Sequence, residues 1–234
     1  QNTIGGSSSD AITHLANTPD GGFIVTGYSF SNISGDKTEN GHNFSADYWI
    51  LKIDSLGAIQ WQNTIGGNGS DLPLSAYSNA DGTCIVAGYS SSGATGDKTE
   101  ANLGGFDFWI LKLSAAGGVL WQNTIGGNNS DIPNSVVPAI DGGIIIGGYS
   151  SSGISGDKTI ENFEFYHSAD FWVLKLDAFG DITWQAAYGG NADDYPKNLM
   201  QTDDGGFMLS GYSYSPISGN KTDASLGEED YWAI

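Results

Sequence analysis

Short apolar segments separated by turn-forming residues recur along the whole chain. In the first stretch, residues 11–18 alternate in part between apolar and polar side chains, and residues 23–29 are apolar and rich in β-forming residues. Between them lies Pro19–Gly22, where proline presets the backbone and the glycines accept positive φ. The pattern predicts a hairpin of two antiparallel strands.

A second hairpin is predicted after a polar stretch at residues 30–46. Residues 47–54, Asp-Tyr-Trp-Ile-Leu-Lys-Ile-Asp, have the strongest strand pattern of the region, and residues 58–65 lead back after a turn at 55–57. No stretch of the chain shows the 3.6-residue periodicity of a helix. We therefore expect two linked hairpins, which together form a four-stranded antiparallel sheet.

This four-strand pattern occurs four times. The string Gln-Asn-Thr-Ile-Gly-Gly begins at Gln1, Gln62 and Gln122, and a degenerate copy, Gln-Ala-Ala-Tyr-Gly-Gly, begins at Gln185. A period of about 60 residues is typical of arrays in which each unit buries its apolar face against its neighbours. The expected single domain, residues 1–234, consists of the repeats 1–61, 62–121, 122–184 and 185–234.

Four strands in about 60 residues are typical of one blade of a β-propeller, so we expect an all-β fold of four blades. A β-solenoid is the rival architecture, but its coils are shorter and lack long polar loops. Gln1 aligns with Gln62, and Ile234 aligns with Leu51. The N-terminal strand could therefore complete the last blade and close a ring of four. In the alternative, the chain is part of a longer array.

Two long strings of the repeat can be compared with known repeats. They are Asp-Gly-Gly-Phe-Ile-Val-Thr-Gly-Tyr-Ser at residues 20–29 and Asp-Tyr-Trp-Ile-Leu-Lys-Ile-Asp-Ser-Leu-Gly-Ala-Ile-Gln-Trp-Gln-Asn-Thr-Ile-Gly-Gly at residues 47–67. The combination resembles the propeller-type repeats of large secreted and surface proteins of Bacteroidota, many of which are cargo of the type IX secretion system. The resemblance implies a propeller and an extracellular or cell-surface setting, and it carries no catalytic motif.

The seven tryptophans recur at two fixed positions of the repeat, as expected for side chains buried between neighbouring blades. One series is Trp49, Trp109, Trp172 and Trp232, and the other is Trp61, Trp121 and Trp184. The single cysteine, Cys84, lies in an apolar run, so we expect a buried thiol there.

The charge balance limits the classes of partner. The chain has 27 acidic residues against 8 basic ones, all of them lysine, and a formal net charge of −19. Such a surface repels phosphate backbones and anionic lipid surfaces, so we expect neither nucleic acid nor a membrane surface as a partner. No apolar run is long enough to span a membrane, which excludes insertion by a helix. Cations and hydroxyl-rich neutral ligands fit this charge.

Propeller topology predicts that most of the acids gather on one face. The links between repeats share a face with the long loops between the second and third strands, and the tight turns lie on the other face. Acids occur in the links, in the long loops and at the first position of the third strands. We expect a strongly negative face, which the loop lysines Lys37, Lys98, Lys158 and Lys221 offset only in part.

Two interpretations of these acids stay open. The loop motif Gly-Asp-Lys-Thr begins at Gly35, Gly96 and Gly156, with Gly-Asn-Lys-Thr at Gly219, and its aspartate can cap a turn. Alternatively, acids of the link, the loop and the third strand converge as the oxygen ligands that Ca²⁺ prefers. The candidate metal ligands are Asp10, Asp36, Asp47, Asp71, Asp97, Asp107, Asp131, Asp157, Asp170, Asp194, Asn220 and Asp230.

Residues that break the repeat are the place to look for catalysis. They include His14, His42 and the insertion at residues 161–167, in which Glu161 or Glu164 could partner an aspartate in glycoside hydrolysis. A carboxylate pair is easily found among so many acids, and no catalytic triad, metal triad or phosphate loop accompanies it. The sequence favours a protein that is not an enzyme, with a glycoside hydrolase as the minor alternative.

A binding module explains the loops better than an enzyme does. Four similar sites suit repeated ligands, because avidity raises weak single-site affinity. We expect a secreted adhesion module that binds glycans or surface proteins through the acidic loop face, with Ca²⁺ as its one candidate cofactor. A structural surface or filament subunit, which self-associates through its chain ends, is the alternative. The candidate ligand-binding residues are Phe30, Phe44, Phe106, Phe165, Tyr166 and Tyr214.

Overall fold

The chain is all-β. The computed structural model describes residues 1–163 and 168–234, and within these ranges there is no helix, hence none long and apolar enough to cross a membrane. The strands are β1 (Asp10–Asn17), β2 (Phe23–Ser29), β3 (Asp47–Ile53), β4 (Ile59–Ile65), β5 (Asp71–Ser78), β6 (Cys84–Ser90), β7 (Asp107–Leu113), β8 (Val119–Ile125), β9 (Asp131–Pro138), β10 (Ile144–Ser150), β11 (Asp170–Leu176), β12 (Ile182–Tyr188), β13 (Asp194–Gln201), β14 (Phe207–Ser213) and β15 (Asp230–Ala233).

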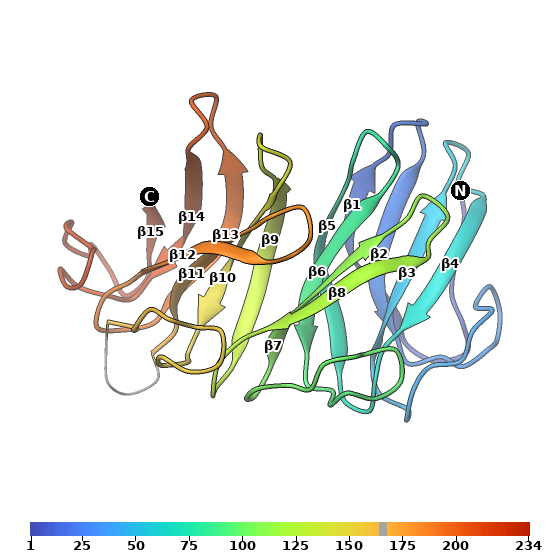
Figure 1. Cartoon of the computed structure of the whole chain (residues 1–234), viewed down its shortest axis with the longest axis horizontal. Helices are drawn as coiled ribbons and strands as arrows, with labels where there is room; N and C mark the ends of the chain where they lie inside the picture. Colours follow the sequence, from blue (N-terminus) through green and yellow to red (C-terminus); the bar gives the residue numbers. More distant parts are fainter. Residues whose placement is uncertain (164–167) are drawn as a thin grey trace. The chain divides into compact units, whose positions relative to one another are not determined.

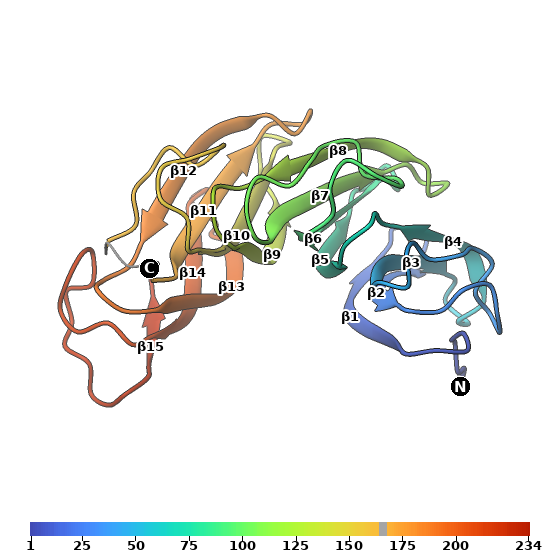
Figure 2. The same cartoon turned by 90° about the horizontal axis from the view of Figure 1, so that it is seen from below.

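The strands form one antiparallel sheet for each sequence repeat (Figures 1 and 2). The first three sheets are β1-β2-β3-β4, β5-β6-β7-β8 and β9-β10-β11-β12, and the fourth has three strands, β13-β14-β15. The hairpins predicted in the first repeat are confirmed to within one residue at each end. Repeated sheets of this kind are consistent with a propeller-like fold.

Two compact units contain these sheets. One consists of Gln1–Asn102 with Trp109–Thr124, and the other of Leu103–Phe108 with Ile125–Ile234. We call them the first unit and the second unit. The expected single domain over residues 1–234 stays a prediction.

The tight hairpins obey the turn chemistry that the sequence indicates. Gly21, in the turn between β1 and β2, has φ +80°, and a backbone bond from its amide to the Thr18 carbonyl closes the turn at 3.0 Å. Positive φ is the region that favours glycine over residues with a Cβ atom. The first strand of each repeat also carries a bulge, between Ile12 and His14 in β1.

The core of the first unit lies between its two sheets. The Tyr48 ring of β3 lies 4.9 Å from the Trp109 ring of β7, and its hydroxyl donates to the Trp109 carbonyl at 3.1 Å. Ile50, Ile65 and Cys84 belong to the same buried cluster, and Cys84 is fully enclosed. The buried thiol is therefore confirmed, and burial raises its pKa to about 12.

The second unit repeats this packing. Phe108 lies 5.2 Å from Trp172, and Phe171 lies 5.0 Å from Trp232, each ring pair tilted by about the same angle as in the first unit. An aromatic residue at the second position of the third strands β3, β7 and β11 thus packs on the tryptophan of the following sheet. This contact is the periodic packing that the tryptophan series predicted.

The two tryptophan series differ in burial. Trp49, Trp109 and Trp172 are buried as expected, and Trp232 is half-buried. For the other series the expectation is wrong, because Trp61 and Trp121 are only half-buried and Trp184 is 38% exposed. These residues lie on fourth strands, which are sheet edges, and Trp61 reaches outward to donate to the Ala115 carbonyl at 3.0 Å.

Candidate functional site

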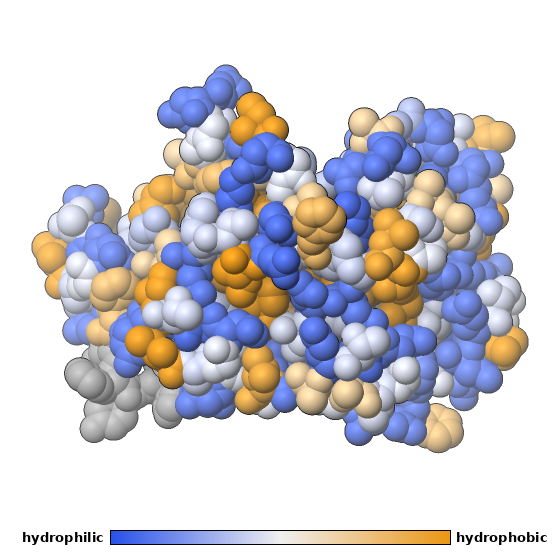
Figure 3. All heavy atoms as spheres, viewed as in Figure 1, coloured by the Kyte–Doolittle hydropathy of each residue, from blue (hydrophilic) through white to orange (hydrophobic). Residues whose placement is uncertain are grey.

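The long loops and the links between repeats lie at one end of each sheet, and the tight turns lie at the other end, as expected (Figure 1). We call these the loop end and the turn end. Residues 30–46 join β2 to β3 at the loop end, and the link at residues 66–70 leaves β4 beside them. The surface visible in Figure 3 is mostly hydrophilic, with smaller apolar patches.

The carboxyls at the strand starts are buried, although the sequence predicted that they line an acidic surface. They are the first residues of the third strands and of the first strands, and each is 0% exposed: Asp47, Asp107, Asp170, Asp71, Asp131 and Asp194. Their counterparts Asp10 and Asp230 are half-buried. The acidic cluster that we expected to face solvent is therefore partly buried inside the protein.

Backbone amides and serine hydroxyls donate hydrogen bonds to the buried carboxylates of the first strands. Asp71 accepts hydrogen bonds from the Gly67 amide at 2.8 Å and the Ser92 hydroxyl at 2.9 Å. Asp131 and Asp194 accept from the equivalent glycine and serine at distances within 0.1 Å of these. Hydrogen bonds to the ionised form are what makes a buried carboxylate tolerable.

The four lysines of the Gly-Asp-Lys-Thr loops are buried too, and the expectation that they offset charge at the surface is wrong. Lys37, Lys98, Lys158 and Lys221 are each at most 4% exposed. The ammonium of Lys98 donates to the Thr124 hydroxyl at 2.6 Å and to the Glu100 carbonyl at 2.7 Å. The sequence could not separate this lysine from a solvated one, because the surrounding loop is polar.

Two of these lysines interact electrostatically with the first-strand and third-strand aspartates of their own repeat. For Lys158 these are Asp131 and Asp170, and for Lys37 they are Asp10 and Asp47. Burial lowers the pKa of Lys158 and of Lys37, and it raises the pKa of Asp170 to about 7 and that of Asp47 to about 6. Desolvation therefore disfavours both charges, and their mutual attraction opposes it.

The aspartates of the Gly-Asp-Lys-Thr motifs tie the loops to the links. Asp97 accepts a hydrogen bond from the Gly66 amide at 3.2 Å, and its own amide donates to the Gly66 carbonyl at 2.8 Å. The same residues in the other repeats, Asp36, Asp157 and Asn220, accept from Gly5, Gly126 and Gly189. These side chains thus bind a backbone amide, as the turn-capping interpretation expected, but the amide belongs to the link and not to their own turn.

Within residues 1–163 and 168–234, no three His, Cys, Asp or Glu side chains lie close enough together to hold one metal ion. The carboxylates Asp10, Asp36 and Asp47 of the first repeat each bind a different backbone amide, those of Gly6, Gly5 and His42. The Ca²⁺ assignment stays a prediction.

The aromatic candidates differ in exposure. Phe44 is 88% exposed and is held at φ +58°, in the left-handed region, after Asn43 at φ +47°. Phe30 is 42% exposed, with its ring edge-on to Tyr28 at 6.0 Å, and Phe106 is half-buried. The candidates Phe165 and Tyr166 lie outside the described residues, as do Glu164 and His167.

A row of tyrosines in the second unit is the site feature that the sequence analysis missed, apart from its outermost member. Tyr149 contacts Tyr195 with ring centroids 4.9 Å apart, Tyr195 contacts Tyr212 at 5.4 Å, and Tyr212 contacts Tyr214 at 5.9 Å. Tyr195 and Tyr214 depart from the repeat, and that departure is the signal that could have found them. We call these four residues the tyrosine row.

The residues weighed for glycoside hydrolysis have structural partners. Glu161 accepts the Ile154 amide at 3.1 Å within its own loop. His42 lies with Nδ1 3.4 Å from Asp47 and Nε2 3.6 Å from Asp97. His14 is half-buried, and burial lowers its pKa.

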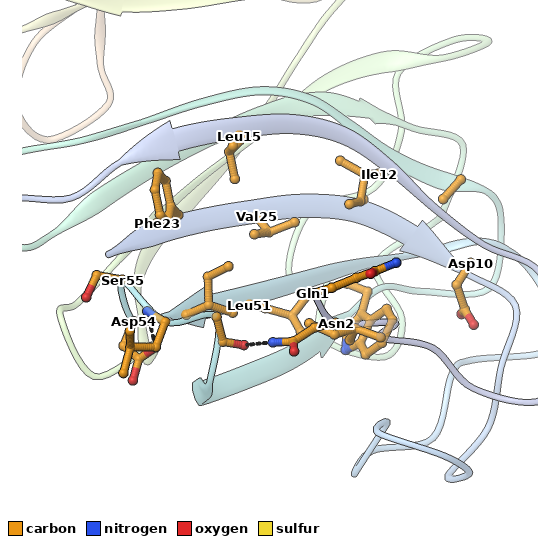
Figure 4. Close-up of a pocket in the computed structure, with 17 residues that line it drawn as sticks. Gln1, Asn2, Asp10, Ile12, Leu15, Phe23, Val25, Leu51, Asp54 and Ser55 are labelled. Carbon is orange, nitrogen blue, oxygen red and sulfur yellow. Dashed lines mark hydrogen bonds between the residues drawn. The ribbon is translucent and has the colours of Figure 1, made fainter. Parts of the chain in front are cut away.

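The first sheet has a hollow on the face turned away from the second sheet. This cavity of about 480 Å³ is lined by apolar side chains of β1, β2 and β3, among them Ile12, Leu15, Phe23 and Val25 (Figure 4). Ile12 and Leu15 are 74% and 55% exposed, whereas their equivalents in the second sheet, Pro73 and Ala76, are buried. A face that is covered in one repeat is thus open in another.

The N-terminal segment lies against the first sheet, along this hollow, in the same way as β4 lies against the second sheet. The Asn2 side chain donates to the Gly57 carbonyl at 2.7 Å, the dashed bond of Figure 4. In the next repeat, Asn63 of β4 donates in the same way to Gly117 at 2.5 Å. Ile4 packs against the buried cluster that contains Trp49.

Comparisons with known proteins show limited similarity. No protein-family model matches the chain. The regulatory protein FlaEY of Caulobacter vibrioides is 28% identical over 182 residues, which cover 75% of this chain and 19% of that protein. The chain therefore spans less than a fifth of this relative's length.

Similar solved structures include a protein of unknown function from Bacteroides caccae, with 12% identity, a TM-score of 0.46 and coverage of 87% of this chain and 54% of that one. A variant of the Synechocystis apocarotenoid oxygenase has 10% identity and a TM-score of 0.47, covering 97% and 48%. Kuenenia stuttgartiensis hydrazine synthase has 11% identity and a TM-score of 0.40, covering 94% and 62%. The chain spans about half to two-thirds of these structures.

Proposed function

We propose that this chain is a non-enzymatic extracellular or cell-surface adhesion module that binds glycans or surface proteins through its loop ends. The observation that carries the proposal is the contrast between the interior and the tips of the loops. Inside, buried aspartates such as Asp71 bind both a link amide (Gly67) and a loop hydroxyl (Ser92), and buried lysines such as Lys98 hold the loop to the fourth strand. At the tips, Phe44 and Tyr214 are exposed at 88% and 42%.

Rigid loops with exposed aromatic rings suit carbohydrate binding. An aromatic ring offers a flat apolar face to the C–H bonds of a sugar, and loops held by hydrogen bonds lose little conformational entropy when a ligand binds. Neighbouring carboxylates and amides can accept and donate hydrogen bonds to sugar hydroxyls. The formal charge of −19 disfavours polyanionic partners.

A glycan array tests this proposal, run with calcium and with chelator so that the expected Ca²⁺ dependence is measured as well. The informative variant is Phe44→Ala, and Leu56→Ala is its matched control, because Leu56 is 87% exposed but lies in a turn at the opposite end of the same sheet. Binding should fall in Phe44→Ala and be unchanged in Leu56→Ala. Equal binding by both variants and the wild type would contradict a role of this loop.

The open face of the first sheet favours a second candidate function, that of a structural surface or filament subunit. Exposed Ile12 and Leu15 around the 480 Å³ cavity mark a surface whose equivalents in other repeats are buried by a neighbouring sheet.

For the fold, we propose a four-bladed propeller in which the segment Gln1–Ile4 completes the three-stranded sheet β13-β14-β15. A longer array of blades is the alternative that would also cover this face.

Hydrogen exchange tests the ring. Closure in a monomer predicts slow exchange of the backbone amides at residues 2–4 and in β15, because both would gain strand partners. Light scattering gives the mass in the same samples. Fast exchange of both segments in a monomer would exclude closure, and slow exchange only in larger species would favour the filament subunit.

A further inference from the structure

The last repeat departs from the others at three positions that the fold brings together. Tyr195 stands where the first three repeats have Ala11, Leu72 and Ile132. Lys197 replaces Thr13, Leu74 and Asn134, and Tyr214 replaces Phe30, Ser91 and Ser151. Apart from Phe30, the other repeats have small or aliphatic residues at these positions, so packing alone does not require tyrosine or lysine.

These departures lie in and beside the tyrosine row. Tyr195 is the second residue of β13 and pairs with Tyr212 of β14, and Tyr214 follows the end of β14, so all three lie at the loop end of the sheet. The rings meet alternately edge-on and tilted, at interplanar angles of 87°, 43° and 88° from Tyr149 to Tyr214. The Lys197 ammonium lies 5.3 Å from the centre of the Tyr212 ring, in the range of a cation–π contact.

The outermost ring is fixed in place and still open to solvent. The Tyr214 hydroxyl donates to a carboxylate oxygen of Glu229 at 2.7 Å, and the Tyr212 ring supports one edge. Tyr214 is nevertheless 42% exposed. The bond to Glu229 raises the pKa of Tyr214 to about 12, so its hydroxyl stays protonated at neutral pH.

Polar groups suited to sugar hydroxyls surround the row. Asp193 accepts the Ala169 amide at 2.9 Å, and its backbone carbonyl accepts the Tyr214 amide at 3.0 Å. The Glu229 carboxylate uses one acceptor position for Tyr214, and an ionised carboxylate offers about four. A preorganised ring next to carboxylate acceptors has the composition of a carbohydrate subsite.

We propose that Tyr195, Tyr212 and Tyr214, with Glu229 beside them, form a binding site for a neutral sugar ring of a glycan. This proposal rests on the proposed adhesion function and assigns it to one site in the last repeat. The sugar stacks on the open face of Tyr214, and its hydroxyls donate to Glu229. A neutral sugar fits better than a uronic acid, because Asp193 and Glu229 repel a carboxylate.

Variants that restore the repeat sequence provide the test, because the same residues already fold in the other sheets. Tyr195→Ile introduces the residue found at position 132, and Tyr214→Ser introduces the residue found at position 151. Phe179→Ala, which introduces the residue found at position 116, is the matched control, since Phe179 is a 78% exposed aromatic residue of the same unit that lies in a turn at the opposite end of its sheet. Calorimetric titration would use maltohexaose, cellohexaose and mannohexaose as neutral probes and hexagalacturonate as the anionic probe.

We expect at least one neutral hexasaccharide to bind, and both tyrosine variants to weaken it by at least about tenfold, or about 1.4 kcal/mol. The melting temperature of each variant and the affinity of Phe179→Ala should equal those of the wild type. Unchanged binding in the tyrosine variants would overturn this site and leave the adhesion function standing. A higher affinity for hexagalacturonate than for the neutral hexasaccharides would contradict the assignment of a neutral sugar as the ligand. If neither these hexasaccharides nor the glycan array gave any binding, both proposals would fail.

Discussion

The charged residues of the loop ends serve mainly to hold the backbone in place. Asp71, Asp131 and Asp194 each accept a glycine amide and a serine hydroxyl, and a lysine from the loop is buried nearby. Charged groups are costly to bury unless they are paired and hydrogen-bonded. The repeated network supplies these partners to one carboxylate oxygen, Oδ2, of each aspartate, and it fixes the loops that carry the exposed aromatic rings.

Two of these carboxyls should make stability depend on pH. Burial raises the pKa of Asp47 to about 6 and that of Asp170 to about 7, above the value of about 4 in an unfolded chain. Between these values the folded protein binds more protons than the unfolded chain, so the free energy of unfolding falls as pH rises. We expect the melting temperature to decrease from about pH 5 to about pH 7.5.

Other groups contribute to this profile, so variants are needed to isolate the effect. His14, whose pKa burial lowers, acts in the opposite direction, and His42 and Asp71 both lie near Asp47. Asp47→Asn and Asp170→Asn should each flatten the dependence of the melting temperature on pH. A slope identical to that of the wild type in both variants would show that these carboxyls do not titrate in this range.

Removing a buried lysine should be costly. Lys98→Met leaves the electrostatic interaction with Asp71 unmatched and deletes the bond to the Thr124 hydroxyl. Loss of one partner of a buried pair typically costs about 3–5 kcal/mol. Denaturant titration measures this loss, and Lys112→Met, at a half-buried lysine of the same unit, should cost much less. Equal costs would mean that Lys98 does not stabilise the buried carboxylates.

At the scale of the strands, one aromatic contact recurs in every sheet interface of the two units. The second residue of a third strand packs on the tryptophan of the following sheet, as Tyr48 does on Trp109 and Phe171 does on Trp232. Because sheets in such arrays stabilise each other through their interfaces, these rings couple neighbouring repeats. The fourth-strand tryptophans, which lie at sheet edges, contribute less buried surface.

Truncation of the two tryptophan series should therefore give different losses. Trp109→Ala removes a fully buried ring and should destabilise the protein by about 3–5 kcal/mol. Trp184 is 38% exposed, so Trp184→Ala should cost less. Both losses can be measured by urea titration followed by circular dichroism. A larger loss in Trp184→Ala would contradict the ranking by burial.

For the whole molecule, a formal charge of −19 creates self-repulsion that cations can relieve. If Ca²⁺ binds the folded form selectively, stability should rise by about 2.7 kcal/mol at a hundredfold excess over the dissociation constant. Mg²⁺ should do less because it demands a tighter octahedral geometry, and NaCl should act by screening alone.

Melting temperatures in chelator, Ca²⁺, Mg²⁺ and NaCl at matched ionic strength separate these effects. A rise specific to Ca²⁺ would support the metal ligands predicted from the sequence. The same melting temperature in all four solutions would reject them and leave Asp36, Asp97 and Asp157 as residues that tie the loops to the links.

The sequence by itself determined the strands, the turns and the repeat. The hairpins of the first repeat were predicted to within one residue, because alternation of side chains and turn residues such as Gly21 are local properties of the chain. The stacked third-strand tryptophans followed from the period alone. The partial exposure of the tryptophans on the fourth strands did not follow from it, because a repeat period does not show how far a side chain on an edge strand is covered.

Only the tertiary structure decided which polar side chains are buried and which residues form the candidate sites. Lys98 and Asp71 occur in polar stretches whose sequence is typical of solvated loops, yet both are buried. Asp97 accepts a hydrogen bond from the Gly66 amide, which lies 31 residues earlier in the sequence. Tyr195 and Tyr214 come together because two strands pair in one register. Local pattern carries backbone preference and amphipathicity, but the solvation of a charged group depends on donors and acceptors that distant segments bring to it.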